Sequence, residues 1–161
     1  MSVYEIASKD SVLRKLLDEA VRAVRATEGS ILLLSEDGKS LRFVVSHSPV
    51  ADKLLHLEQP LGKGITGLSV SLQQPMIVNE TERSSAFDPS VDVETGVHTK
   101  SIMVIPLVTP AQEFGALTAI NSSASVGFEA PDLERYSEFA EQIASRLSNL
   151  GLKMNDAGTV K

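Results

Sequence analysis

The sequence predicts an α+β fold with a central, mainly antiparallel sheet of about five to six strands. The N- and C-terminal helices would pack on one face of this sheet. Loops and short helices that form a ligand pocket would lie on the other face. Two observations carry the prediction. Apolar residues recur at helical spacing near both ends of the 161-residue chain. Between these ends lie pairs of short apolar segments joined by turns, the pattern of β-hairpins.

The terminal helices are predicted over residues 11–27 and 130–151. Asp10 precedes the first and offers an N-cap, and Pro131 falls in the first turn of the second, where its missing amide costs little. Each apolar stripe is narrow and close to heptad spacing. Such a stripe packs either on the chain's own sheet or against a second helix or subunit, and the sequence leaves both interpretations open.

A β-hairpin is predicted over residues 30–46, because Asp37–Gly38 supplies the positive φ that a tight turn needs. A second pair of strands, at 100–107 and 114–121, is joined by a turn around Pro110. The other expected elements are a loop or short helix at 49–59, a short helix at 64–73 and a strand at 75–79.

Residues 80–99 form a long polar segment broken by Pro89 and Gly96. A loop of this length in a small domain is usually functional or disordered. It leads directly into the apolar strand at 100–107. We therefore expect this segment to be the lid and wall of a pocket.

The chain is long enough for one domain, which we expect at 11–151, preceded by a lead-in (1–10) and followed by a flexible tail (152–161). A net charge of −6 argues against nucleic acid or an anionic membrane surface as partner. The N-terminus lacks the pattern of a secretory leader, and no apolar run approaches the roughly 20 residues of a membrane helix. These features predict a cytoplasmic protein.

Catalytic and metal chemistry finds little support in the sequence. The absence of cysteine excludes thiolate nucleophiles and cysteine-based metal sites. The histidines, His47, His56 and His98, lack partners at metal-ligand spacing. The glycines around Lys63 fit neither a Walker nor a Rossmann phosphate loop. We expect a protein that is not an enzyme, and we assign no metal and no cofactor, although His98 could contact a ligand or provide one axial bond to a haem.

The element order and several short motifs together resemble a GAF domain over about residues 11–150. The motifs are Glu28–Gly29–Ser30, the run from Leu61 to Gly67, Pro75 before its strand, Lys100–Ser101 leading to Pro106–Leu107, and Gly115 to Asn121. The resemblance implies a sensory or regulatory module of signal transduction. Many such modules bind a small molecule between the sheet and its loops, and many dimerise through their terminal helices.

Within the family, the segment from Phe87 to Lys100 looks most like the cyclic-nucleotide-binding group, in which an Asp-x-x-Thr-Gly-x-x-Thr lid covers the nucleotide. Asp92, Thr95 and Thr99 match that lid, and Ser30 matches a serine of the pocket floor. Val45 and Ser46 align with a base-reading Phe-Asp pair, and Thr118 aligns with a pocket glutamate. The resemblance thus implies these ligand-binding residues: Ser30, Val45, Ser46, Phe87, Asp92, Thr95, His98, Thr99 and Thr118.

The chain departs from that group downstream, where the Asn-Lys…Phe-x-x-x-Asp-Glu signature is incomplete. Asn121, Phe128 and Asp132 are present, but Ser122 and Leu133 replace the lysine and the glutamate. The Lys–Asp ion pair of the group cannot form here.

The sequence therefore predicts a homodimeric sensory GAF domain that joins through helices 11–27 and 130–151 and signals to an output protein. Its ligand would be a small molecule of unknown identity, with a cyclic nucleotide as one candidate. The alternative is a ligand-free structural module that dimerises and relays signals through its terminal helices.

Overall fold

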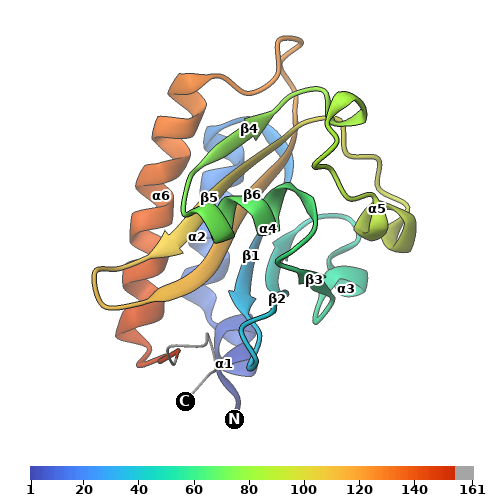
Figure 1. Cartoon of the computed structure of the whole chain (residues 1–161). Coiled ribbons are helices and arrows are strands. Elements are labelled where there is room, and N and C mark those ends of the chain that lie inside the picture. The colour runs from blue at the N-terminus through green and yellow to red at the C-terminus, as the bar shows by residue number, and fades with distance from the viewer. Residues whose placement is uncertain (155–161) are drawn as a thin grey trace.

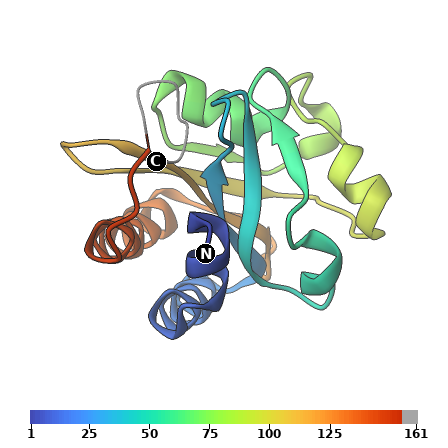
Figure 2. The same ribbon diagram turned by 90° about the horizontal axis from the view of Figure 1, so that it is seen from below.

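The computed structural model describes residues 1–154 of the chain. It contains a six-stranded sheet with the order β3-β2-β1-β6-β5-β4, in which every neighbouring pair is antiparallel. Helices α2 and α6 lie side by side against one face, while α4 lies on the opposite side (Figures 1 and 2). The predicted α+β architecture is confirmed.

The elements follow the predicted order, with bounds that differ by a few residues. The helices are α1 (Val3–Lys9), α2 (Ser11–Ala23), α3 (Ala51–Leu54), α4 (Gly64–Leu72), η1 (Thr81–Arg83), α5 (Ser90–Thr95) and α6 (Ala130–Asn149). The strands are β1 (Ala26–Leu34), β2 (Ser40–His47), β3 (Glu58–Pro60), β4 (Met76–Val78), β5 (Ile102–Val108) and β6 (Glu113–Ser122).

Strand β1 is central, and its two faces are divided between the helices and the pocket. Gly29 lies on the helix face, where a Cβ atom would come within 2.5 Å of Val21 and 2.9 Å of the Tyr136 hydroxyl. Only glycine permits this close approach of α2 and α6 to the sheet. The alternation of a strand places Ser30 on the opposite face. It pairs with Ser46 of β2 on one side and Thr118 of β6 on the other.

The apolar stripes of the two long helices are buried inside the chain. On α2 the buried side chains include Leu13 and Leu17, and on α6 they include Tyr136, Ile143 and Leu147. The Arg146 guanidinium donates two hydrogen bonds, of 3.0 and 2.7 Å, to the carboxylate of Asp10, which also caps α2. The stripes therefore pack on the chain's own sheet, the first of the two interpretations that the sequence left open.

The segment predicted as a lead-in is instead a packed helix, α1. Its Val3, Tyr4 and Ala7 are buried, and the Tyr4 hydroxyl donates to the Leu34 carbonyl at 2.7 Å. Burial raises the pKa of Tyr4 to about 12. The Arg42 guanidinium lies 4.5 Å from the centre of the Tyr4 ring. The apolar residues of this short segment were too few to show a helical period in the sequence.

The start of the predicted tail is also packed. Leu152 and Met154 are buried, and the Gln112 side chain bonds the Leu152 carbonyl at 3.0 Å and the Met154 amide at 2.7 Å. Residues 155–161, which make up the rest of the predicted tail, lie outside the described residues.

Short elements occur both in the segment predicted as a loop or short helix (49–59) and in the long polar segment (80–99). Residues 49–59 form α3 and run into β3, an edge strand that pairs with β2. The polar segment 80–99 contains η1 and α5.

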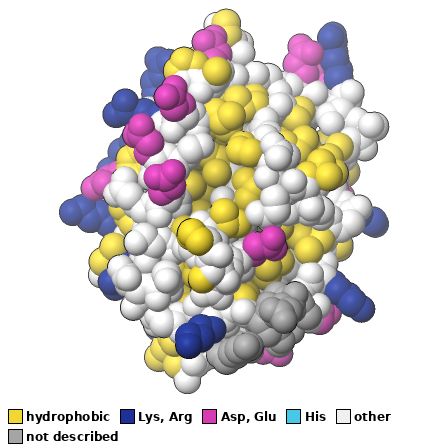
Figure 3. Space-filling model, turned by 60° about the vertical axis from the view of Figure 1, so that its left-hand side comes forward, with side chains coloured by type: hydrophobic (Ala, Val, Ile, Leu, Met, Phe, Trp, Pro, Cys, Tyr) yellow, Lys and Arg dark blue, Asp and Glu magenta, His cyan; other side chains and the backbone are white. Residues whose placement is uncertain are grey.

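Over residues 1–154, none of the helices has the length and apolar character required to cross a bilayer. Figure 3 views the molecule from the side of α6 and shows hydrophobic side chains gathered in the middle of that face.

Candidate functional site

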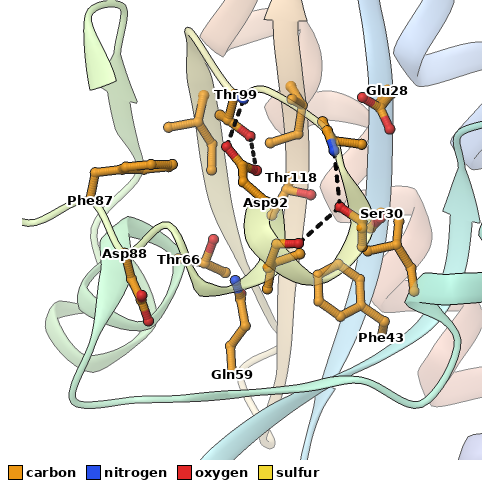
Figure 4. Close-up of a pocket in the computed structure, with 16 residues that line it drawn as sticks. Glu28, Ser30, Phe43, Gln59, Thr66, Phe87, Asp88, Asp92, Thr99 and Thr118 are labelled. Atoms are coloured by element: carbon orange, nitrogen blue, oxygen red, sulfur yellow. Dashed lines mark hydrogen bonds between the residues drawn. The ribbon is translucent and has the colours of Figure 1, made fainter. Parts of the chain in front are cut away.

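A cavity lies on the face of the sheet opposite α2 and α6, beneath the segment that contains α5 (Figure 4). Its volume is about 70 Å³, room for only a few water molecules. The polar side chains around it are Glu28, Ser30, Gln59, Thr66, Asp88, Asp92, Thr95, Thr99 and Thr118. The apolar ones are Phe43, Leu54, Phe87, Val91, Val97, Ile102 and Ile120.

The floor of the cavity is built from neighbouring strands. Ser30 of β1 lies opposite Thr118 of β6, and both side chains are buried. The Ser30 hydroxyl lies 2.8 Å from the hydroxyl of Ser46, so the two form a hydrogen bond at the side of the floor. The Thr118 and Thr66 side chains make no hydrogen bond within residues 1–154, although both residues are at least 95% buried. Neither hydroxyl oxygen is fully enclosed by protein atoms, so both are available to a molecule in the cavity.

The lid is held closed by the carboxylate of Asp92. Its two oxygens accept from the Thr99 amide and the Thr99 hydroxyl, each at 2.7 Å. The Thr95 hydroxyl donates to the Val91 carbonyl at 2.9 Å and accepts from the Val97 amide at 3.3 Å. Gly96 ends α5 in the left-handed region at φ 78°, where glycine carries no steric cost. Figure 4 draws these bonds across the roof of the cavity.

Asn121 anchors the C-terminal end of the lid to the sheet. Its side-chain oxygen accepts from the amides of Lys100 and Ser101, and its side-chain nitrogen donates to the His98 carbonyl at 2.9 Å. Asn121 adopts a positive φ of 58°, a conformation that asparagine tolerates better than most residues. Its role is therefore to hold the backbone of the lid.

Asp132 acts at the start of α6. Its carboxylate accepts from the Glu129 amide at 2.9 Å and completes a capping box. Ser122 stands where the ion pair would need a lysine, as the sequence indicated. The Asp132 carboxylate instead caps the N-terminus of α6.

The chain has been compared with known proteins, and a family model described as GAF domain matches residues 8–149. This chain belongs to the GAF domain family.

Two curated relatives are a mouse cone cGMP-specific 3',5'-cyclic phosphodiesterase subunit alpha' and a probable 3',5'-cyclic phosphodiesterase, pde-5, of Caenorhabditis elegans. The first is 25% identical over 88 residues, 55% of this chain and 10% of the relative. The second is 22% identical over 146 residues, 85% of this chain and 20% of the relative. The GAF domain thus spans a fifth or less of these two relatives.

Solved structures agree with this fold. The GAF domain of an Acinetobacter phosphoenolpyruvate-protein phosphotransferase superposes with a TM-score of 0.74 at 14% identity, covering 94% of this chain and 85% of that one. The second GAF domain of DevS from Mycobacterium smegmatis gives 0.70 at 19% identity, with 88% and 94% covered. A type II free methionine-R-sulfoxide reductase from Thermoplasma acidophilum gives 0.72 at 18% identity, with 91% and 96% covered. At these identities the likeness concerns the fold alone.

The GAF domain brings six of the nine expected site residues to the cavity: Ser30, Phe87, Asp92, Thr95, Thr99 and Thr118. Three lie elsewhere. Val45 pairs with Ile31 on the helix face of the sheet. Ser46 lies beside Ser30 on the same face of the sheet and bonds to it, but it is not among the residues that line the cavity. His98 is exposed on the outer side of the lid. Val45 faces the helices because alternate residues of a strand point to opposite faces. The bond from Asn121 to the His98 carbonyl holds the backbone at His98 outside the cavity.

The sequence did not indicate several residues that line the cavity of this GAF domain, notably Glu28, Phe43, Gln59, Thr66 and Asp88. Glu28 could have been found from Ser30, because strand residues two apart share a face. The others come from β2, β3, α4 and the loop before α5, whose approach to one another is a matter of tertiary structure.

The ionisable lining of the cavity is acidic. Glu28, Asp88 and Asp92 are carboxylates, and the lining contains no lysine, arginine or histidine among the described residues. The Ser90 hydroxyl and amide donate to Asp88 at 2.6 and 3.0 Å, and with Lys63 nearby they lower the pKa of that carboxyl. No group of three or more metal-ligating side chains occurs in the part of the chain that the structure describes.

Proposed function

We propose that this GAF domain is a regulatory module that binds a small molecule in the cavity beneath α5 and does not transform it. The observation that carries the proposal is the pair of hydroxyls on Thr66 and Thr118, two largely buried residues that line the cavity and whose side chains take no hydrogen-bond partner within residues 1–154. A ligand in the cavity could bond to both hydroxyls.

Ligand binding on this view requires the lid to move. The closed cavity of about 70 Å³ is far below the roughly 300–1,000 Å³ of most ligand pockets. The two hydrogen bonds between Asp92 and Thr99 join α5 to the loop that follows it. Opening the lid breaks these bonds or moves the whole segment as a unit. Asp92, Thr95 and Thr99 would then control access and need not themselves touch the ligand.

A hydrogen-bonded route from the cavity to α2 supports the regulatory part of the proposal. Ser46 and Ser48 of the β2 segment bond the cavity residues Ser30 and Glu28. On α2, the Arg14 guanidinium donates to the Ser46 carbonyl at 2.7 Å. Asp18 lies 2.8 Å from the His47 ring nitrogen. Three consecutive residues, Ser46, His47 and Ser48, thus connect the cavity wall to α2. We propose that a signal passes through this helix to an output protein, with the cytoplasm as its setting.

A cyclic nucleotide is one candidate ligand. The names of the mouse and nematode relatives favour it, as does the match of Asp92, Thr95 and Thr99 to the lid pattern. The acidic lining weighs against it, because a cyclic phosphate would find no basic side chain there.

The alternative is a ligand-free module that only dimerises and relays. Partly buried apolar side chains on α6 and β4, including Leu133, Phe139 and Ile77, support it, and they belong to the elements on the side seen in Figure 3. The fully buried apolar stripe of α2 and α6 gives no support to this alternative, because it is already buried inside the chain. A homodimer through the outer sides of these helices remains our proposal.

The deciding experiment is a thermal-shift scan with cyclic AMP, cyclic GMP and small metabolites, on the wild type and on Thr118→Val. A ligand at a hundred times its dissociation constant adds about 2.7 kcal/mol, about 5–10 °C in melting temperature for a chain of this length. The shift should shrink in Thr118→Val. Thr109→Val is the matched control, because the Thr109 hydroxyl has no partner within residues 1–154 and lies outside the cavity. A domain that no compound stabilises would favour the ligand-free alternative.

A further inference from the structure

We propose that the cavity selects a small organic amine in its protonated form over phosphate esters and carboxylates. This inference rests on the proposed function and narrows the class of ligand. It is drawn from the charges, the free hydrogen-bonding groups and the apolar surfaces that face the cavity.

The charges around the cavity come from three different elements. Glu28 lies on β1, Asp88 in the loop before α5, and Asp92 on α5 itself. Lys63, whose charge acts on Asp88, is not among the lining residues of the cavity; it lines a neighbouring hollow beside α4, which Phe87 and Asp88 also line. An anion entering the cavity would meet carboxylates without a compensating cation, whereas an ammonium group would be attracted.

Free acceptors remain on two of these carboxylates. Glu28 accepts from Ser48 through one oxygen only, and both bonds from Ser90 reach the same oxygen of Asp88. Within residues 1–154 the second oxygen of each carboxylate takes no hydrogen bond. Both oxygens of Asp92 are already engaged by Thr99. The two unpartnered hydroxyls of Thr66 and Thr118 can also accept. An ammonium group, which donates three bonds and accepts none, matches this set.

The rest of the lining suits a short hydrocarbon body. Phe43 and Phe87 contribute aromatic rings, whose faces attract cations. Ile102 and Ile120 add apolar surface from β5 and β6. The small volume of the closed cavity, about 70 Å³, restricts a ligand that binds under a closed lid to a few heavy atoms.

The test compares three probes of nearly equal size and different charge: butylammonium, butan-1-ol and butyrate. Each is titrated into the full chain at constant ionic strength, with binding followed by melting temperature and by amide shifts in NMR spectra. Butylammonium should bind at least tenfold more tightly than butanol, and butyrate should not bind. Glu28→Gln or Asp88→Asn should weaken the binding of butylammonium measurably, by about two- to tenfold, since each removes one charge of an incompletely desolvated site.

Glu36→Gln is the matched control, because Glu36 is an exposed carboxylate in the β1–β2 turn. It should leave the affinity for butylammonium unchanged. Stronger binding of butyrate or of a cyclic nucleotide, with loss in Thr118→Val, would overturn the amine assignment while leaving the proposed ligand site intact. Failure of every probe and every cyclic nucleotide to bind the folded chain would overturn both. Equal binding of butylammonium to wild type, Glu28→Gln and Asp88→Asn would overturn the amine assignment alone.

Discussion

At the scale of single residues, the lid motif forms hydrogen bonds within the lid itself. In the structure Asp92 bonds Thr99 and Thr95 bonds its own helix. Contact of Asp92, Thr95 and Thr99 with a ligand stays a prediction. A pattern of hydroxyls and a carboxylate can stabilise a lid as well as bind a ligand, because the same atoms serve both purposes.

This role predicts the effect of removing the Asp92 carboxylate. Asp92→Ala leaves the Thr99 amide and hydroxyl without acceptors in a buried position. We expect amides of residues 90–99 to exchange with solvent faster, and the lid to lose about 1–3 kcal/mol of local stability. Hydrogen exchange followed by mass spectrometry measures this.

Glu94→Ala is the control, since Glu94 is exposed on the same helix. Amide hydrogen exchange in residues 90–99 of Glu94→Ala should match that of the wild type. Unchanged exchange in Asp92→Ala would contradict the assignment of Asp92 as the residue that closes the lid.

At the scale of elements, the two terminal helices are joined to one another as well as to the sheet. The Asp10 carboxylate caps α2 through the Leu13 amide at 2.9 Å and receives two bonds from Arg146 on α6. The side-chain hydrogen bonds of Arg146 hold the pKa of Asp10 below its usual value. One partly buried carboxylate thus fixes the start of one helix against the end of the other.

The lowered pKa of Asp10 predicts how stability depends on pH. The carboxyl ionises at lower pH in the folded chain than in the unfolded chain, so its stabilisation is fully present above the unfolded pKa of about 3.9. That stabilisation is lost as the pH falls through the folded pKa. The difference in unfolding free energy between wild type and Arg146→Gln should therefore be constant near neutral pH and shrink towards pH 2.

Urea unfolding at a series of pH values measures that difference. Arg135→Gln, an exposed arginine on the same helix, serves as control and should show a small difference at every pH. A difference between wild type and Arg146→Gln that is the same at pH 2 and pH 7 would count against the Asp10–Arg146 pair as its source.

At the scale of the whole molecule, the sheet separates a cavity from two helices, and the β2 segment 46–48 touches both sides. Ser30 on the cavity floor bonds Ser46, and the backbone carbonyl of Ser46 accepts from Arg14. A change in the cavity floor therefore has a direct physical route to α2.

This route makes a prediction about long-range effects. Ser30→Ala removes the bond to Ser46, and we expect it to shift the amide resonances of α2, most strongly near Arg14 and Asp18. Thr66→Val changes the cavity without touching β2 through any hydrogen bond, so α2 should keep its wild-type resonances. Two-dimensional NMR spectra compare the two. Equal shifts in α2 for both variants would argue against a specific connection through Ser46.

The elements and their order were determined largely by the sequence, since each rests on a local signal. Asp37–Gly38 predicts the β1–β2 turn, and the apolar periods predict α2 and α6, because turn chemistry and periodicity act over a few residues. The same local signals were too weak for α1 and β3. Their few apolar residues become buried only when the rest of the chain provides a surface, as Tyr4 does against Leu34.

The site was decided by the tertiary structure. The sequence identified the lid and Ser30, because a motif and a strand position can be read along the chain. It could not identify Thr66, Asp88 or Phe43, which reach the cavity from separate elements. Nor could it distinguish a stripe that packs on its own sheet from one that joins two subunits, because the spacing of Leu13 and Leu17 is the same in both. Burial of those residues where α2 packs on β1, β2 and α6 decides the matter, since packing depends on which surfaces meet and not on periodicity alone.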